Sequence, residues 1–213
     1  MKFSYKSLYL LVLAALILIG CSRKKDKFLN KGFHSITTKY NYLYNGNNLL
    51  NQGKADINEN VFDNYWDILP IEKTQITEDK PKLKIKEEQS ASLFTQSEEK
   101  AVLAIQKHAM NIAGKEKNPQ MDEAYFLLGE SRYYDQRFIP SLEAFNYILF
   151  KYPTSELVNK AKIWREKINA KQNYNELAIK NLKKIESRGK LSKEEIVDLN
   201  VVFAQAYLCT PVY

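Results

Sequence analysis

Turn-forming and metal-binding residues are scarce in this 213-residue chain, which has 7 Gly, 6 Pro, 2 Cys and 2 His. Cys21 lies at an expected processing site, so Cys209 has no partner for an internal disulfide. The cysteine and the histidines that remain are too few for a four-ligand structural zinc site. Scarce glycine and proline, together with few alternating apolar runs, predict an all-α body.

Motifs of the common enzyme classes are absent. The sequence contains no G-x-S-x-G, no H-E-x-x-H and no Gly-rich loop that could cradle a phosphate. Its carboxylates lie in charged helical sequence, which is typical of solvated faces, and no pair of acids stands out for glycan hydrolysis. We therefore expect no catalytic residues, no cofactor, no metal and no small-molecule substrate.

The charge of the chain is moderately basic, with 32 basic and 25 acidic residues and a net charge of +7. If Lys2 and Lys6 are removed with the N-terminal segment, 30 basic residues remain against 25 acidic ones. The basic residues do not cluster on one expected element, so the sequence does not predict binding to nucleic acid.

The N-terminus has the parts of a bacterial lipoprotein signal peptide. Lys2 and Lys6 precede an apolar core, residues 8–19, which is too short to span a bilayer comfortably as a helix. The core leads into Gly20 and Cys21, in the sequence Leu-Ile-Gly-Cys. This resembles a lipobox, in which the small Gly20 admits the peptidase and the Cys21 thiol accepts the lipid. An ordinary signal peptide or an uncleaved anchor is the alternative.

Cleavage between Gly20 and Cys21 would remove residues 1–20 and anchor the chain to a membrane by its covalent lipid. Ser22, rather than aspartate, follows the cysteine, which resembles the outer-membrane sorting signal of enteric lipoproteins. Residues 21–32 are expected to form a tether, either solvated or in contact with anionic head groups. Its basic residues are Arg23, Lys24, Lys25, Lys27 and Lys31.

Residues 33–70 predict a degenerate helical pair. The first pattern covers residues 35–52 and is followed by Gly53, a plausible helix stop. The second covers residues 54–69, where apolar residues recur at helical spacing until Pro70 ends the pattern.

The segment 71–92 is dense in charge and poor in aromatic residues. Such a composition predicts a charged linker or a long loop, or a segment that becomes ordered only on a partner. The two histidines, His34 and His108, are expected to be structural or surface residues rather than catalysts.

Residues 93–213 contain a series of expected helical hairpins. The best-formed hairpin covers residues 118–156, where Asn118 can cap the first helix and Pro119 can open it. A short turn follows, and Pro140 starts the second helix of the hairpin.

Capping boxes mark two other expected helices. In a capping box, a Ser or Thr is followed three positions later by a Glu or Gln. Thr95 and Glu98 have this spacing at the start of a helix that is expected to run to about Ala113. Ser192 and Glu195 have the same spacing at the start of the last helix. The last helix has no partner before the sequence ends, so the last repeat is expected to be incomplete and the chain to be part of a longer protein.

The hairpin at residues 118–156 resembles a tetratricopeptide repeat. The residues that carry the resemblance are Tyr125, Leu128, Gly129, Ser141, Phe145 and Pro153. Pro119 and Pro153 are 34 residues apart, which is the period of that repeat. Two residues depart from the pattern of the repeat. Ser141 stands where alanine is usual, and Tyr133 lies one position after the place that the pattern gives to a tyrosine. The resemblance implies an α-solenoid of antiparallel helix pairs, and a generic helical hairpin is the alternative.

A solenoid of this type presents a concave surface that typically holds an extended or helical peptide. The side chains spaced to face such a groove are Glu123, Phe126, Glu130 and Tyr133. Phe126 could instead pack between repeats.

A more specific resemblance covers the whole mature chain, and its specific signature lies in the first part of the expected body. The segments that carry it are Phe33-His34, Thr37-Thr38-Lys39-Tyr40-Asn41, Tyr44-Asn45-Gly46-Asn47 and Tyr65-Trp66-Asp67-Ile68-Leu69-Pro70. They resemble the N-terminus of the SprE/PorW-type lipoproteins, which are much longer tetratricopeptide proteins of Bacteroidetes associated with gliding motility and type IX protein secretion.

This resemblance implies a lipid-anchored outer-membrane protein that faces the periplasm and binds protein components of a secretion or motility machine. It supplies no catalytic residues. The alternative is a helical-repeat lipoprotein that captures nutrients or glycans.

Overall fold

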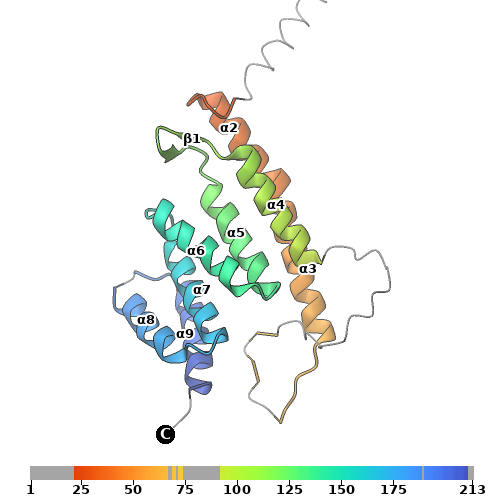
Figure 1. Ribbon diagram of the computed structural model, residues 1–213, viewed down its shortest axis with the longest axis vertical. Helices are drawn as coiled ribbons and strands as arrows, with labels where there is room; N and C mark the ends of the chain where they lie inside the picture. The colour runs from red at the N-terminus through yellow and green to blue at the C-terminus, as the bar shows by residue number, and fades with distance from the viewer. Residues whose placement is uncertain (1–21, 67–68, 71, 74–91, 189, 211–213) are drawn as a thin grey trace, which may run out of the picture.

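The computed structural model describes residues 22–66, 69–70, 72–73, 92–188 and 190–210 (Figure 1). Most of these residues are helical, which confirms the expected all-α class. The predicted signal peptide, Cys21 and most of the predicted linker lie outside the described residues, so they stay predictions.

The helices follow one another along the chain, and their bounds are α2 (Phe28–Thr37), the π-helix η1 (Thr38–Leu43), α3 (Tyr44–Asn60), α4 (Leu93–His108), α5 (Met121–Tyr134), α6 (Phe138–Lys151), α7 (Val158–Lys171), α8 (Asn175–Arg188) and α9 (Lys193–Leu208). Between α4 and α5, strands β1 (Asn111–Ile112) and β2 (Lys115–Glu116) form an antiparallel hairpin. Consecutive helices from α3 to α8 contact one another, and α9 packs against both α7 and α8. In Figure 1, α2 lies toward one end of the long axis and α8 and α9 toward the other.

The first helical region is continuous rather than a helical pair. It runs through α2, η1 and α3 over residues 28–60, so the helix end expected at Gly53 is absent. Gly53 instead allows α3 and α4 to approach each other, because a Cβ at this position would lie 2.7 Å from the ring of Phe94. The glycine is therefore needed for packing and not for ending a helix.

The prediction of a second helix over residues 54–69 is also wrong. Helix α3 ends at Asn60, and residues 61–64 have no regular structure. The apolar pattern continues past this point, but Tyr65 and Trp66 are 81% and 96% exposed. The pattern predicted too long a helix because no neighbouring surface buries these side chains.

The start of α4 also differs from the predicted capping box. Ser92, and not Thr95, caps the helix, and its hydroxyl accepts a hydrogen bond from the Thr95 amide at 3.1 Å. Glu98 therefore does not cap the helix. Its carboxylate instead accepts a hydrogen bond from Arg132 Nε of α5 at 2.7 Å.

Helix α4 ends at His108 rather than near Ala113, because the β-hairpin follows it. Ala113 and Gly114 form the tip of this hairpin with φ angles of 50° and 77°. Two successive residues with positive φ are typical of a tight hairpin turn. Gly114 thus supports a turn and not a helix end.

Replacing Ala113 by glycine is expected to stabilise the protein by up to about 1 kcal/mol, because a residue with a Cβ is strained in the left-handed region. Urea unfolding followed by circular dichroism measures this difference. The control is Ala55→Gly on the exposed face of α3, which should cost about 1 kcal/mol. A loss of stability in both variants would contradict the strain at Ala113.

Asn118 joins three parts of the chain and does not cap α5, which begins at Met121. It is 2% exposed, and its side-chain amide donates hydrogen bonds to Thr38 Oγ1 and to the His108 carbonyl, both at 3.0 Å. A buried amide with these partners holds η1, the end of α4 and the start of α5 together. The predicted cap is wrong because the side-chain oxygen accepts its hydrogen bond from the Gln120 amide at 3.1 Å, before α5 begins.

The contact between α5 and α6 centres on Gly129. A Cβ at this position would lie 2.6 Å from the ring of Phe145. The Ser141 hydroxyl of α6 donates a hydrogen bond to the Gly129 carbonyl at 2.7 Å. Leu128 and Phe145 are both buried in the core that extends from α3 to α7. The two small residues therefore allow two helix backbones to pack closely.

The remaining residues of the predicted repeat pattern lie at the edges of this hairpin. Tyr125 is half-buried, and its ring stacks on that of Tyr147 with centroids 4.1 Å apart. Pro140 lies in the first turn of α6, where a proline is tolerated. Pro153 is exposed just after α6 ends at Lys151.

Helix α9 starts with the capping box that the sequence predicts. The Ser192 hydroxyl accepts from the Glu195 amide at 3.2 Å, and the Glu195 carboxylate accepts from the Ser192 amide at 2.7 Å. Leu199 and Val202 of α9 are buried in a smaller cluster with residues of α7 and α8. The α9 surface thus completes one wall of the hollow described next.

Candidate functional site

A hollow of about 260 Å³ lies between α5, α7 and α9, with Lys54 of α3 at one edge. Phe126 and Glu130 of α5 line it, together with Trp164 of α7 and Val202 of α9. Aromatic, aliphatic and charged side chains therefore meet in one concave place. Such a mixture suits the binding of a peptide segment better than the binding of a small polar molecule.

The four side chains expected to face a groove have different positions. Phe126 and Glu130 line the hollow. Tyr133 is fully buried and lines a small adjoining pocket, so it is not an anchor on the open surface. Glu123 is exposed and lies outside the hollow.

Trp164 organises the aromatic side chains behind the hollow. Its ring stacks on that of Phe145 at a centroid distance of 5.6 Å and meets the edges of Phe126 at 6.1 Å and Tyr133 at 5.2 Å. Phe126 thus packs between helix pairs, as the alternative interpretation of this residue required, and also borders the hollow. The sequence pattern did not indicate that Trp164 is central, because its neighbours come from other helices.

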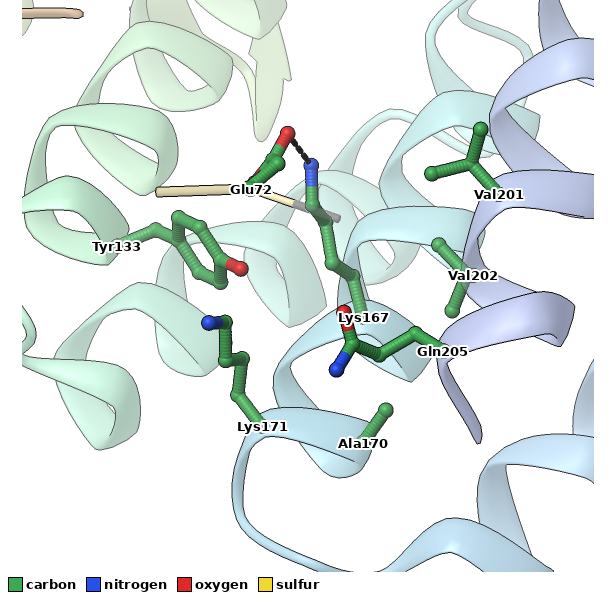
Figure 2. A pocket seen from close by; sticks show the side chains of 8 residues that line it. All are labelled: Glu72, Tyr133, Lys167, Ala170, Lys171, Val201, Val202 and Gln205. Atoms are coloured by element: carbon green, nitrogen blue, oxygen red, sulfur yellow. Dashed lines mark hydrogen bonds and ion pairs between the residues drawn. The ribbon is translucent and has the colours of Figure 1, made fainter. Parts of the chain in front are cut away.

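The adjoining pocket contains a carboxylate from the predicted linker. Figure 2 shows the Glu72 side chain at one side of this pocket, where it meets the Lys167 ammonium; Tyr133 and Lys171 also line the pocket. The carboxylate forms an ion pair with Lys167 and accepts a hydrogen bond from the Tyr134 hydroxyl at 3.3 Å. An acidic side chain from a distant part of the sequence is therefore held against α5 and α7.

The two lysines around Glu72 are partly withdrawn from water. The Lys167 ammonium lies 4.1 Å from the centre of the Trp164 ring and 5.4 Å from that of Tyr133, which adds cation–π attraction. Burial lowers the pKa of the Lys171 ammonium below its ordinary value, and the Glu72 carboxylate opposes this effect. This cationic, aromatic pocket favours an acidic group.

Two ion pairs lie at the rim of the hollow. Lys54 and Glu130 lie 3.9 Å apart, and Lys160 and Glu194 lie 3.2 Å apart. Burial raises the pKa of the Glu130 carboxyl, and Lys54 opposes this effect. Asp198 of α9 also lines the hollow, and burial raises the pKa of its carboxyl. The hollow therefore contains charged groups of both signs.

Replacing Glu72 by glutamine is expected to release this segment from the pocket, because the amide keeps the size of the side chain and loses its charge. Stability should fall by about 1 kcal/mol, and trypsin should cleave after Lys73 more rapidly. Timed digestion followed by mass spectrometry measures the rate. The control is Glu59→Gln at an exposed position on α3, which should digest as the parent does. Equal rates in all three proteins would contradict the holding role of Glu72.

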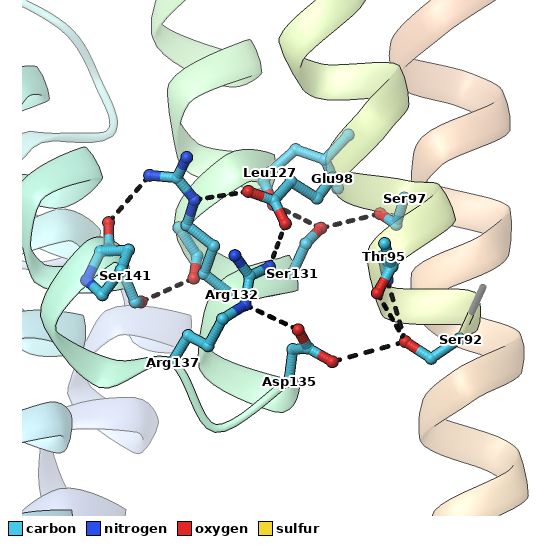
Figure 3. A network of polar contacts seen from close by, with 12 residues as sticks. Ser92, Thr95, Ser97, Glu98, Leu127, Ser131, Arg132, Asp135, Arg137 and Ser141 are labelled. Atoms are coloured by element: carbon cyan, nitrogen blue, oxygen red, sulfur yellow. Dashed lines mark hydrogen bonds and ion pairs between the residues drawn. The ribbon is translucent and has the colours of Figure 1, made fainter. Parts of the chain in front are cut away.

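A polar network fixes the helices that support the hollow (Figure 3). The Glu98 carboxylate pairs with both Arg132 and Arg137, and Arg137 Nε also lies 2.7 Å from Asp135. Burial raises the pKa of the Glu98 carboxyl, but hydrogen bonds from the two arginines outweigh burial and hold it below its usual value. These contacts connect the start of α4 to the turn between α5 and α6, which makes them structural.

Two further kinds of site are not found in the described part of the chain. There, no group of three or more His, Cys, Asp or Glu side chains is arranged to hold a metal ion. None of the helices described is both long and apolar enough to cross a membrane.

Comparisons with known proteins give no identification, since no family model matches the chain and no curated protein matches it either.

Proposed function

We propose that this chain is a non-catalytic envelope scaffold of the SprE/PorW type, anchored by a lipid on Cys21 to the outer membrane and facing the periplasm. It binds protein components of the machinery for type IX secretion and gliding motility. Its helix pairs form a tetratricopeptide-type α-solenoid, and a partner segment lies against α5, α7 and α9.

The observation that carries this proposal is the hollow between α5, α7 and α9. Glu72 is held there by Lys167 and Tyr134, so the surface is suited to a chain segment that bears a carboxylate. Close packing at Gly129 and Phe145 also supports the repeat interpretation, since that contact needs small residues where tetratricopeptide repeats have them. The opening segments from Phe33 to Pro70 support the assignment to secretion and motility.

Deletion of the gene that encodes this chain is the test of this function. The deletion strain should fail to secrete type IX cargo and should form non-spreading colonies. Restoring the gene should restore both properties. Normal secretion and normal spreading in the deletion strain would rule out the proposal, and specific binding of glycans by the purified protein would favour the capture lipoprotein instead.

The lipid anchor is tested separately with Cys21→Ser. This variant should accumulate as unprocessed precursor and take up no labelled fatty acid, because the acceptor thiol is missing. Gel mobility and metabolic labelling measure these properties, with Cys209→Ser as the control that should be processed normally. A Cys21→Ser protein of mature size that carries the label would show that the lipid is attached elsewhere.

A further inference from the structure

Helix α2 has its apolar and polar faces reversed relative to an ordinary surface helix. Asn30 and His34 on its inner face are 2% and 3% exposed. Phe28, Leu29 and Ile36 on its outer side are 85%, 75% and 61% exposed. The hydrophobic effect favours the opposite arrangement in water.

Hydrogen bonds hold the polar side chains of α2 and η1 inside. Thr38 Oγ1 donates to the His34 carbonyl at 2.6 Å and accepts from the Asn118 amide at 3.0 Å. His34 Nδ1 lies 2.9 Å from His108 Nδ1 of α4. Asn30 donates to the Ser22 carbonyl at 2.8 Å. The helix cannot turn its apolar face inward without breaking these contacts.

The outer face forms a continuous stripe, which we call the α2 stripe and define as Leu29, Phe33, Ile36, Tyr40 and Tyr44. These residues recur every three or four positions, which places them along one side of a helix. The least exposed of them, Phe33, is still 46% exposed. At 1.5 Å per residue, the stripe is about 22 Å long.

Basic residues outnumber acidic ones in the segment that carries the α2 stripe. Residues 22–44 contain six basic residues and one acidic residue. The acidic residue, Asp26, lies 3.0 Å from Lys31 and 2.9 Å from Lys117, so its charge is offset within the protein. Lys24 and Lys25 are exposed just before the stripe begins.

An exposed apolar stripe with flanking lysine and arginine is the pattern of a helix that lies in an anionic lipid interface. We propose that the outer face of α2 and η1 lies on an anionic membrane surface, with the α2 stripe at the acyl boundary and the basic residues among the head groups. This contact goes beyond the proposed scaffold function and does not require a lipid on Cys21. Ile139 and Phe150 of α6 are also exposed, at 67% and 84%, but they stand 11 positions apart and do not repeat at the close spacing of the α2 stripe.

The test is flotation of residues 22–213 with lipid vesicles, because this form lacks Cys21 and so cannot bind through the proposed lipid anchor. The protein should float with vesicles of equal phosphatidylcholine and phosphatidylglycerol and should not float with phosphatidylcholine alone. Added salt should weaken binding. The double variant Phe33→Ser, Ile36→Ser should bind about tenfold more weakly, because it removes two apolar groups from the interface.

A matched control is the double variant Ile139→Ser, Phe150→Ser on α6, which should bind as the parent does. The charge variant Lys24→Gln, Lys25→Gln leaves the stripe intact and should weaken binding to anionic vesicles only. Far-UV circular dichroism checks that each variant is folded.

Failure of the parent protein to float with anionic vesicles would overturn the proposal, as would unchanged binding in both the serine stripe variant and the charge variant. Dimerisation in size-exclusion chromatography that the stripe variant abolishes, without vesicle binding, would assign the surface to a second copy of the chain. Each result is independent of the secretion assay, so the membrane contact and the scaffold function can fail separately.

Discussion

The variant Gly129→Val is expected to lose about 3 kcal/mol of stability, because a branched side chain has no space between α5 and α6. The first added carbon alone would lie 2.6 Å from the Phe145 ring. Phe145 is fully buried and stacks on Trp164, so its ring has little room to move away. Urea unfolding followed by tryptophan fluorescence measures the loss, because Trp164 is buried in the folded chain whereas Trp66 is exposed already.

Two opposing effects act when a glycine in a helix is replaced, and their sizes decide whether the variant is more or less stable than the parent. Replacing glycine by alanine gains up to about 1 kcal/mol of helix propensity, whereas overpacking a core contact costs about 1–3 kcal/mol. The control is Gly32→Ala on α2, where a Cβ would have no heavy atom within 4 Å. That variant should be neutral or stabilising. An equally stable Gly129→Val protein would contradict the close contact with Phe145.

Gly129 also shows what the sequence could predict. Its role depends on residues of a single hairpin, and local spacing placed Leu128, Gly129, Ser141 and Phe145 correctly on two packed helices. The same is true of the capping box at Ser192. Features that depend on neighbours in the chain were therefore accessible to pattern and spacing.

Features that depend on distant parts of the chain were not accessible. Gly53 looks like a helix stop until Phe94 is placed against it. Glu72 looks like one charge in a solvated linker until α7 supplies Lys167. No local pattern relates such residues, because the helices that bring them together are set by the packing of the whole body.

The hollow and the α2 stripe depend on the same supporting contacts. Asn118 and Thr38 fix η1 against the start of α5, which also supplies Phe126 and Glu130 to the hollow. Loosening the inner face of α2 would therefore disturb the hollow as well.

His108 is a buried group whose contribution to stability should depend on pH. Burial, with smaller contributions from the charges of His34, Arg23 and Lys107, lowers the pKa of His108 from its usual 6.5 to about 4. His108 is 6% exposed, so its imidazole is held neutral in the folded chain. The unfolded chain has no such restraint.

The sign of the pH effect follows from proton binding. As the pH falls below 6.5, the unfolded chain takes up a proton on His108 that the folded chain does not, down to a pH of about 4. This part of the stability is therefore complete above 6.5 and is lost as the pH falls towards 4. Between about pH 7 and about pH 5, the expected loss is about 2 kcal/mol.

Urea unfolding at these two pH values tests this prediction against His108→Gln, which keeps a polar side chain but cannot titrate in this range. The glutamine variant starts from a lower stability, because the contact with His34 Nδ1 is altered. The quantity to compare is therefore the change in the free energy of unfolding between the two pH values in each protein. The parent should lose about 2 kcal/mol more than the variant over this interval. Equal losses in both proteins would show that other groups control the response to acid, and that His108 is protonated as readily in the folded chain as in the unfolded one.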